Sequence, residues 1–321
     1  MKIEYEVLKF IKKYNMYESG DRVLLGVSGG RDSMVMMDIL FKLKDNLNIS
    51  LGVAHFNHSL RKNADDEELF VKRECRKRSL PFYSKKMDVG NYAKDNKIGI
   101  EEAARKLRYE FFNEILESKM YNKIAIAHYS KDLSETIVYR LIKGTGIFGI
   151  GGVLPVYKNV TRPILSLNFE NLEKYVTINN VKYIIDESNF DTKYSRNKIR
   201  HNILPEFQKI NEKYEDAIFR FAEITWEYRD YLDKVYTERV AVEKNIDNKN
   251  IYKMSLKKDF FDKEILRMVF LELGVFPPSK EEVNKILSMK SRGKRKINNL
   301  TIEKIRNMLY ISKEVVALGG K

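Results

Sequence analysis

Apolar positions form two different patterns over the first half of the chain. Short consecutive apolar runs, which are typical of buried strands, cover residues 22–27, 49–56, 123–127 and, more weakly, 81–87. Apolar side chains at helical spacing lie between or after them, in residues 34–43, 65–78, 100–116 and 133–142. Because strands and helices alternate regularly, the pattern predicts an α/β fold with a doubly wound, mostly parallel sheet.

The pattern becomes irregular after this region. Residues 144–152 include five glycines, and prolines follow at 155 and 163, which predicts a long loop that could act as a lid. Helical spacing returns from residue 207 to about 242, and the polar stretch 243–250 is the best candidate for a linker. Further on, residues 260–273 and 280–289 have helical spacing and residues 296–312 resemble short strands, so a small α+β domain is expected there. The predicted division is a catalytic domain in 1–206, a helical connector and linker in 207–250, and a C-terminal domain in 251–321.

The charge is unevenly distributed. The chain has a formal net charge of +14, and residues 251–321 hold 16 Lys and Arg against 8 Asp and Glu. Clustered cations displace the counterions of nucleic-acid phosphates, so a polyanionic partner is favoured over the alternative of a solvated basic surface. We therefore expect the C-terminal domain to contact nucleic acid.

Several classes of protein are disfavoured by the sequence. No apolar run approaches the roughly 18 residues that a membrane span needs, and the first residues carry acids where a secretory signal has an apolar block. With one cysteine, Cys75, the chain cannot form an intramolecular disulfide or a cysteine-rich metal site. We expect a cytoplasmic protein with no membrane partner.

One short segment combines glycines with hydroxyl and carboxylate groups. It lies between the first predicted strand and the first predicted helix, and it consists of Ser28, Gly29, Gly30, Arg31, Asp32 and Ser33. The glycines allow the backbone to approach a ligand closely, so N–H groups at the helix start can face phosphate oxygens. A carboxylate beside a phosphate needs a cation between them, which makes Asp32 a candidate Mg²⁺ ligand. The alternative is a plain serine–glycine turn with an aspartate helix cap.

This segment resembles the S-G-G-x-D-S signature of the PP-loop ATP pyrophosphatases, and it lacks the Lys-Ser/Thr ending of a Walker A loop. The resemblance implies that ATP is cleaved between its α and β phosphates, with AMP transferred to an oxygen and pyrophosphate released. It does not fix the substrate, because the superfamily includes GMP synthetase, argininosuccinate synthetase and several tRNA-modifying enzymes.

Four further segments, at residues 53–61, 101–109, 127–136 and 186–201, carry the other candidate side chains and all four histidines of the chain. The candidates are His55, Asn57, His58, Arg61, Arg105, Arg108, His128, Asp132, Asp186, Asn189, Arg196 and Arg200. In this order the segments resemble V-x-H-x-N-H-x-L-R, E-A-A-R-x-x-R-Y, A-H-H-x-D-D-Q-x-E-T and D-x-S-N-x-D with R-N-x-x-R, the motifs of the tRNA(Ile)-lysidine synthetases. Read alone, the second and fourth could instead be ion-paired helix surfaces and helix caps.

The resemblance implies a reaction and a set of roles. Lysine would be joined to carbon 2 of the wobble cytidine of the isoleucine tRNA with a CAU anticodon, through an adenylated tRNA. ATP would be bound by residues 28–33 with His55 and His128, and Mg²⁺ by Asp32. Catalysis would fall to Asp32, Arg105, His128 and Asp132. Contacts to tRNA and lysine would fall to Asn57, His58, Arg61, Arg108, Asp186, Asn189, Arg196 and Arg200. A second copy of the chain is a further candidate partner.

The third segment departs from the family pattern, with Tyr129 in place of His, Lys131 in place of Asp and Leu133 in place of Gln. A cation at position 131 would repel Mg²⁺ or a lysine amine, so we expect Asp132 to carry the essential role and Lys131 to point outward toward RNA. Three rival readings remain. They are a tRNA cytidine thiolase of the same superfamily, which the single cysteine disfavours, a catalytically degenerate tRNA-binding relative, and a nucleotide-binding regulator that does not use tRNA.

Overall fold

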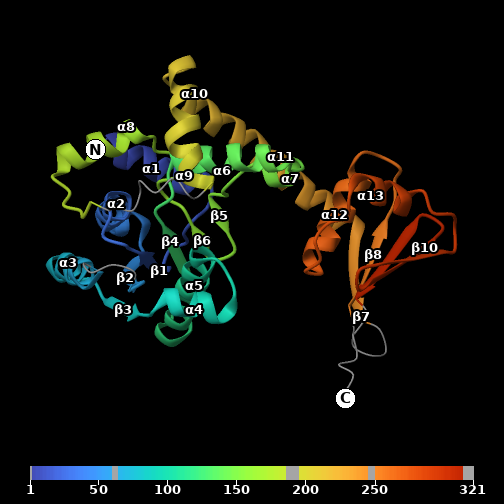
Figure 1. Ribbon diagram of the computed structural model, residues 1–321, viewed down its shortest axis with the longest axis horizontal. Helices are drawn as coiled ribbons and strands as arrows, with labels where there is room; N and C mark the ends of the chain where they lie inside the picture. The colour runs from blue at the N-terminus through green and yellow to red at the C-terminus, as the bar shows by residue number, and fades with distance from the viewer. Residues whose placement is uncertain (1, 60–63, 186–194, 245–249, 314–321) are drawn as a thin grey trace. The chain divides into compact units, whose positions relative to one another are not determined.

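The computed structural model describes residues 2–59, 64–185, 195–244 and 250–313, and the candidates Arg61, Asp186 and Asn189 lie outside these ranges. The chain divides into two compact units, residues 1–223 and 224–321, and the division falls inside the long helix α11 (Tyr214–Arg239). Each unit has its own sheet (Figure 1). None of the helices in the described ranges is long and apolar enough to cross a membrane.

The first unit contains a six-stranded sheet in the order β3-β2-β1-β4-β6-β5. Its strands are β1 (Arg22–Gly26), β2 (Ser50–Asn57), β3 (Phe82–Lys86), β4 (Lys123–Ile126), β5 (Val156–Tyr157) and β6 (Val160–Thr161). All neighbours are parallel except β5, which pairs antiparallel with β6 at one edge. The predicted doubly wound, mostly parallel sheet is confirmed.

Helices cover both faces of this sheet, as continuous apolar strands require. Helices α2 (Arg31–Leu47) and α3 (Ala64–Lys77) lie on one face, and α4 (Val89–Asn96) and α5 (Ile100–Lys119) lie on the other (Figure 1). On the second face Leu24 and Ile124 of the central strands pack with Phe111 and Phe112 of α5 in one buried cluster. Side chains of this size each contribute about 1.5–3 kcal/mol when fully buried.

The remaining elements of the first unit surround this core. They are α1 (Lys2–Lys13), α6 (Ser130–Lys143), α7 (Ile147–Ile150), α8 (Phe169–Asn179), α9 (Ser195–Lys198), the π-helix η2 (Ile199–Ile203) and α10 (Leu204–Ile210). The glycine-rich stretch 144–152 therefore contains one helical turn, α7, where a wholly irregular loop was expected. Helices α1 and α8, each with a buried apolar side, were not among the elements expected from the sequence pattern.

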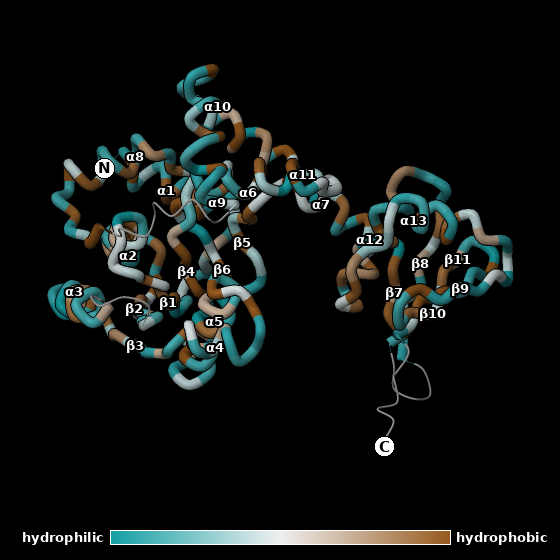
Figure 2. The backbone as a smooth tube through the Cα atoms, viewed as in Figure 1, coloured by the Kyte–Doolittle hydropathy of each residue, from teal (hydrophilic) through white to brown (hydrophobic). Residues whose placement is uncertain are grey.

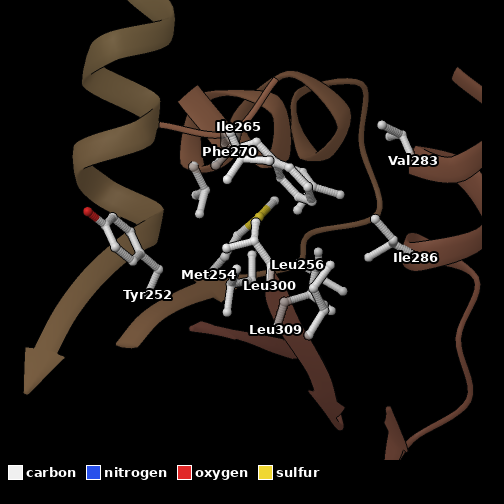
Figure 3. Close-up of a cluster of buried hydrophobic side chains, with 14 of the residues drawn as sticks. Tyr252, Met254, Leu256, Ile265, Phe270, Val283, Ile286, Leu300 and Leu309 are labelled. Carbon is white, nitrogen blue, oxygen red and sulfur yellow. The ribbon is translucent and has the colours of Figure 1, made fainter. Parts of the chain in front are cut away.

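The second unit contains a five-stranded antiparallel sheet in the order β7-β8-β11-β10-β9. Its elements are β7 (Val240–Lys244), β8 (Asn250–Ser255), α12 (Phe261–Glu272), α13 (Lys280–Leu287), β9 (Gly293–Ile297), β10 (Leu300–Ile305) and β11 (Met308–Lys313). Buried Met254, Leu300 and Leu309 of the strands meet Phe270 of α12 in an apolar core (Figure 3). The tube coloured by hydropathy shows apolar positions along these elements (Figure 2). The predicted small α+β domain is thus present.

Two expectations about the connection are wrong. Residues 240–242 have helical spacing but form part of β7, because they pair with residues 252–254 of β8. The polar stretch 243–250 does not separate two units, since Lys244 and Asn250 are partners across β7 and β8 of the same sheet. A polar connection between two strands of one sheet has the same composition as a linker between two units. Only the pairing of the residues at its ends distinguishes a strand connection from a linker.

Candidate active site

The chain forms a cavity of about 790 Å³ at the carboxyl ends of β1, β2 and β4. In doubly wound sheets ligands bind where the strand order reverses, and here β2 and β4 flank β1 on opposite sides. Of the candidates from the sequence, those that line the cavity are Ser28, Gly30, Arg31, Asp32, Ser33, His55, Asn57, His58, Arg108, His128 and Arg200. Gly29, Arg105, Asp132 and Arg196 are not part of the lining.

The predicted phosphate loop is held in shape by its own hydroxyl groups. Ser33 Oγ accepts hydrogen bonds from the backbone N–H groups of Ser28 and Gly29, both at 3.2 Å, and donates to the Gly30 carbonyl at 2.9 Å. Gly29 has a φ of +93°, which favours glycine, and Gly30 is the N-cap of α2. The N–H groups of the first turn of α2 lack partners within the helix, and Arg31, Asp32 and Ser33 of that turn line the cavity, which suits an anionic ligand.

Arg31 and Asp32 form an ion pair beside this loop. Arg31 Nε donates to Asp32 Oδ1 at 2.8 Å, and Arg31 Nη1 lies 2.5 Å from Glu173 of α8. The guanidinium also lies 4.8 Å from the centre of the Phe169 ring. Arg31, which the resemblance assigned to ATP, is therefore bound to two carboxylates in the structure.

His55 is a buried residue of β2 whose ring faces the cavity. Its Nδ1 lies 2.9 Å from the Val27 carbonyl oxygen, which can only accept a hydrogen bond. The proton therefore resides on Nδ1, and Nε2 is left as an acceptor. Burial lowers the pKa of His55, so the ring is neutral at pH 7.

Asn57 and His58 follow at the end of the same strand. The Asn57 amide donates to Asp65 Oδ1 at 3.0 Å and accepts from the backbone N–H of Ser59 at 3.0 Å. The predicted tRNA or lysine contact at Asn57 is thus a buried amide that connects the end of β2 to α3. His58 packs edge-on against Phe56, with ring centres 4.8 Å apart.

His128 lies just after β4, beside a cluster of arginines. Arg162, which the sequence reading did not single out, donates from Nε to His128 Nδ1 at 3.0 Å and from Nη1 to the Leu154 carbonyl at 2.6 Å. Burial, together with the charges of Arg162, Arg196, Arg108 and Arg105, holds the pKa of His128 well below its usual value. Arg162 is itself 7% exposed. The only sequence signal for it was a basic residue directly before Pro163, which is too weak to identify a buried group.

Arg108 and Arg105 belong to the same basic cluster. Arg108 lines the cavity, and in the described ranges its buried Nε atom has no hydrogen-bond partner. Burial and the charge of Arg105 lower the pKa of Arg108, as expected for a cation without an acidic neighbour. Arg105 is exposed and lies over the Tyr109 ring at 4.9 Å, outside the lining. Arg108 is thus a cation of the cavity lining that has no acidic partner among the described residues.

The start of α6 contains Asp132 and the residues that depart from the family pattern. Asp132 Oδ2 accepts from the backbone N–H of Tyr129 at 3.1 Å, and Oδ1 lies 3.3 Å from Arg200 Nη2. Burial, with the charges of Glu135 and Asp32, raises the pKa of Asp132 to about 7 despite Arg200. Lys131 does not point away from the cavity as expected. It lines the cavity, with Nζ 5.6 Å from the centre of the Phe169 ring.

Glu135 anchors the segment that follows the undescribed residues 186–194. It is a fully buried residue of α6 that lies 2.5 Å from Arg200 Nε and 3.6 Å from Arg196 Nε. Arg200 belongs to the π-helix η2, a rare form that often marks functional sites. Glu135 occupies the glutamate position of the third motif, and the structure shows that it fixes Arg200 at the cavity.

Comparison with known proteins agrees with this geometry. A family model described as the PP-loop domain matches residues 1–207. The chain is 46% identical to the tRNA(Ile)-lysidine synthase of Petrotoga mobilis, over 96% of this chain and 97% of that protein. It is 33% identical to that of Thermotoga maritima, over 94% of this chain and 72% of that protein. With the enzyme of Thermosipho africanus it shares 39% identity over 87% of this chain, and spans 65% of that longer protein.

A solved structure supports the fold. The U34-tRNA thiolase NcsA of Methanococcus maripaludis matches with a TM-score of 0.60 at 18% identity, over 70% of this chain and 78% of that one. At this identity the similarity concerns the arrangement of the sheet and helices and leaves the chemistry open.

Proposed function

The chain belongs to the PP-loop family and, within it, to the tRNA(Ile)-lysidine synthases, and from this premise we propose that it joins lysine to the wobble cytidine of a CAU-anticodon isoleucine tRNA. The observation that carries the proposal is the loop of residues 28–33, which is held in shape by hydrogen bonds to Ser33 Oγ. This loop and the start of α2 line the cavity at the carboxyl ends of the strands. ATP supplies the driving force. The product, lysidine, pairs with A instead of G.

The proposed reaction has two steps. The 2-oxo oxygen of the cytidine attacks the α-phosphorus of ATP and pyrophosphate leaves, which gives an adenylated tRNA. An amine of lysine then attacks carbon 2, and AMP leaves with the former 2-oxo oxygen. The first step converts a poor leaving oxygen into a good one, and the second forms the carbon–nitrogen bond.

The residues of the cavity suit these steps. The N–H groups of residues 31–33 would bind phosphate oxygens, and Arg108 would stabilise the negative charge that grows as pyrophosphate leaves. The neutral rings of His55 and His128 would contact the nucleotide through Nε2. We assign the lysine amine to Asp132, which is not part of the lining but is hydrogen-bonded to the lining residues Tyr129 and Arg200.

We propose that Asp32 binds Mg²⁺ together with the phosphates of ATP. In the described ranges no group of three or more His, Cys, Asp or Glu residues could hold a metal ion by themselves. Mg²⁺ commonly binds through one or two carboxylates together with substrate phosphates, and Asp32 provides one such carboxylate at the phosphate loop. Bound there, the ion would neutralise phosphate charge, and the N–H groups at the start of α2 would orient the same oxygens.

The proposed partners are tRNA(Ile), lysine and a second copy of the chain, and the proposed compartment is the cytoplasm, where ATP and tRNA are available.

A sulfur-transfer reaction is disfavoured by the chemistry of Cys75. The thiol is 1% exposed, and burial raises its pKa to about 12, so it is a poor nucleophile.

Incubation of the full chain with ATP, labelled lysine and a pool of tRNAs tests the proposal. We expect label to enter one tRNA as lysidine. Pyrophosphate should be released only when tRNA is present, because the tRNA is adenylated before lysine attacks. A degenerate tRNA-binding relative would bind tRNA without releasing pyrophosphate. A nucleotide-binding regulator would bind ATP with no response to tRNA. Either result would refute the assignment.

The basic second unit is proposed to contact tRNA, and its charge predicts a salt dependence. Lys290, Arg292 and Lys294 are exposed at the start of β9. Each phosphate contact releases about 0.7–0.9 counterion. The triple variant Lys290→Gln, Arg292→Asn and Lys294→Gln should therefore flatten the slope of log affinity against log salt concentration by roughly 2. The comparison is filter binding of tRNA at several salt concentrations.

The matched control removes positive charge from exposed positions of the first unit, with Lys94→Gln and Lys119→Gln. We expect a smaller change of slope in this variant. If the control flattens the slope as much as the triple variant does, or if the triple variant leaves the slope unchanged, the second unit does not supply these contacts.

A further inference from the structure

A buried arginine controls the state of a histidine in the cavity. Arg162 lies at the end of β6, and its guanidinium donates one hydrogen bond to the Leu154 carbonyl and one to His128 Nδ1. The carbonyl bond at 2.6 Å fixes the guanidinium in place, and the 3.0 Å bond then fixes the imidazole. No acidic side chain among the described residues pairs with Arg162, so its interaction with His128 is not a by-product of an ion pair.

The donor in this bond is unambiguous. A guanidinium nitrogen can only donate, so His128 Nδ1 must be the unprotonated acceptor. In the neutral ring the proton is then on Nε2. No hydrogen bond from another described residue reaches Nε2, and His128 lines the cavity. The nitrogen that remains available to a ligand is therefore an N–H donor.

The surrounding charges oppose a second proton on the ring. The charged groups that act on His128 are Arg162, Arg196, Arg108 and Arg105, and all four are cations. Only Arg196 has an acidic neighbour in the described ranges, Glu135 at 3.6 Å. A protonated imidazole would also lose its bond with Arg162, because Nδ1–H and Nε–H would both be donors.

We propose that Arg162 is a positioning residue that holds His128 in the Nε2–H tautomer, so that His128 acts as a permanently neutral hydrogen-bond donor to an anionic oxygen of the nucleotide or adenylate. This inference rests on the proposed function for the identity of that oxygen. It assigns His128 a role distinct from acid–base catalysis. It also distinguishes His128 from His55, whose proton is on Nδ1 and whose Nε2 is an acceptor. The cavity thus presents one donor and one acceptor imidazole.

Nitrogen NMR of the protein labelled with ¹⁵N-histidine tests the tautomer directly. The chain has four histidines, so the spectrum is simple, and His128→Gln identifies the signal. In the wild-type protein we expect His128 with a protonated Nε2 and an unprotonated Nδ1, without titration between pH 5.5 and 8. His55 should show the opposite tautomer and serves as the internal reference. A wild-type His128 that titrates in this range, or that has its proton on Nδ1, would overturn the proposal.

The variant Arg162→Met should release the ring. We expect the His128 signal to shift toward a tautomer mixture or to titrate above pH 5.5, while the His55 signal stays in place and reports an intact fold. In metal sites, loss of a residue that orients a ligand histidine costs about 10–100-fold in activity, and we expect kcat for pyrophosphate release to fall by a similar factor. An unchanged His128 signal, or a changed signal with unchanged kcat, would contradict the positioning role.

Arg140→Met is the matched control. Arg140 likewise donates to loop carbonyls, among them that of Gly152 at 2.7 Å, but it is not one of the four arginines whose charges act on His128. We expect the His128 signal to be unchanged in this variant. If Arg162→Met does not fold, Arg162→Lys replaces it, because it keeps the charge and loses the guanidinium geometry. The NMR result concerns the free protein, so it stands or falls separately from the lysidine assay.

Discussion

Replacing Asp32 with asparagine is expected to slow adenylation of tRNA by at least about 100-fold, the effect typical of losing one electrostatic catalytic group. Asp32 lines the cavity in the first turn of α2, where the phosphates of ATP are proposed to bind. Asparagine keeps the shape of the side chain but not its charge. The expected readout is a fall in kcat for pyrophosphate release, with a higher Mg²⁺ concentration needed for half-maximal rate.

The ion pair with Arg31 offers a competing explanation, because Asp32→Asn also removes a partner of that guanidinium. Glu173→Gln is the matched control, since Glu173 is the other acid bonded to Arg31 and its side chain is 45% exposed. We expect this variant to keep its activity within a few-fold. Equal losses of activity in both variants would mean that Asp32 acts by holding Arg31. Wild-type activity of Asp32→Asn would mean that Asp32 has no role in catalysis.

Replacing Glu135 with glutamine should lower the free energy of unfolding by about 3 kcal/mol. Removing one partner of a buried ion pair commonly costs about 3–5 kcal/mol, because the remaining charge loses its compensation. Glu135 is fully buried, whereas the side chains of Arg200 and Arg196 are 24% and 51% exposed and can recover some hydration, which favours the lower end of that range. Denaturation by urea, followed by circular dichroism, measures the change.

A surface pair on a nearby helix provides the control for this measurement. Glu206 and Lys209 of α10 lie 2.7 Å apart with side chains 61% and 70% exposed. Exposed ion pairs contribute roughly 0–1 kcal/mol, so Glu206→Gln should change stability little. A loss in Glu135→Gln no larger than in the control would show that Arg200 and Arg196 do not depend on Glu135.

Most of the sheet of the first unit was predictable from the chain alone. Its central strands are short runs of apolar residues that are buried on both faces, and the helices between them have one apolar side, so local sequence specifies both. Strands β5 and β6 are two residues long and form only through pairing with each other and with β4. Residues 240–242 likewise keep a helical spacing, and the hydrogen bonds of β8 decide their conformation.

Some features of the candidate site could likewise be predicted from the sequence, and others could not. The position of the 28–33 loop and of the histidines at the cavity could be predicted from the sequence, because they follow predicted strands and strand ends converge in a parallel sheet. The partner of each charged group could not: Arg31 pairs with Asp32 and Glu173, Arg200 with Glu135, and Arg162 with His128. The physical reason is that charges and hydrogen-bond donors act over a few ångströms of space, and residues 34 or 65 positions apart become neighbours only when the chain has folded.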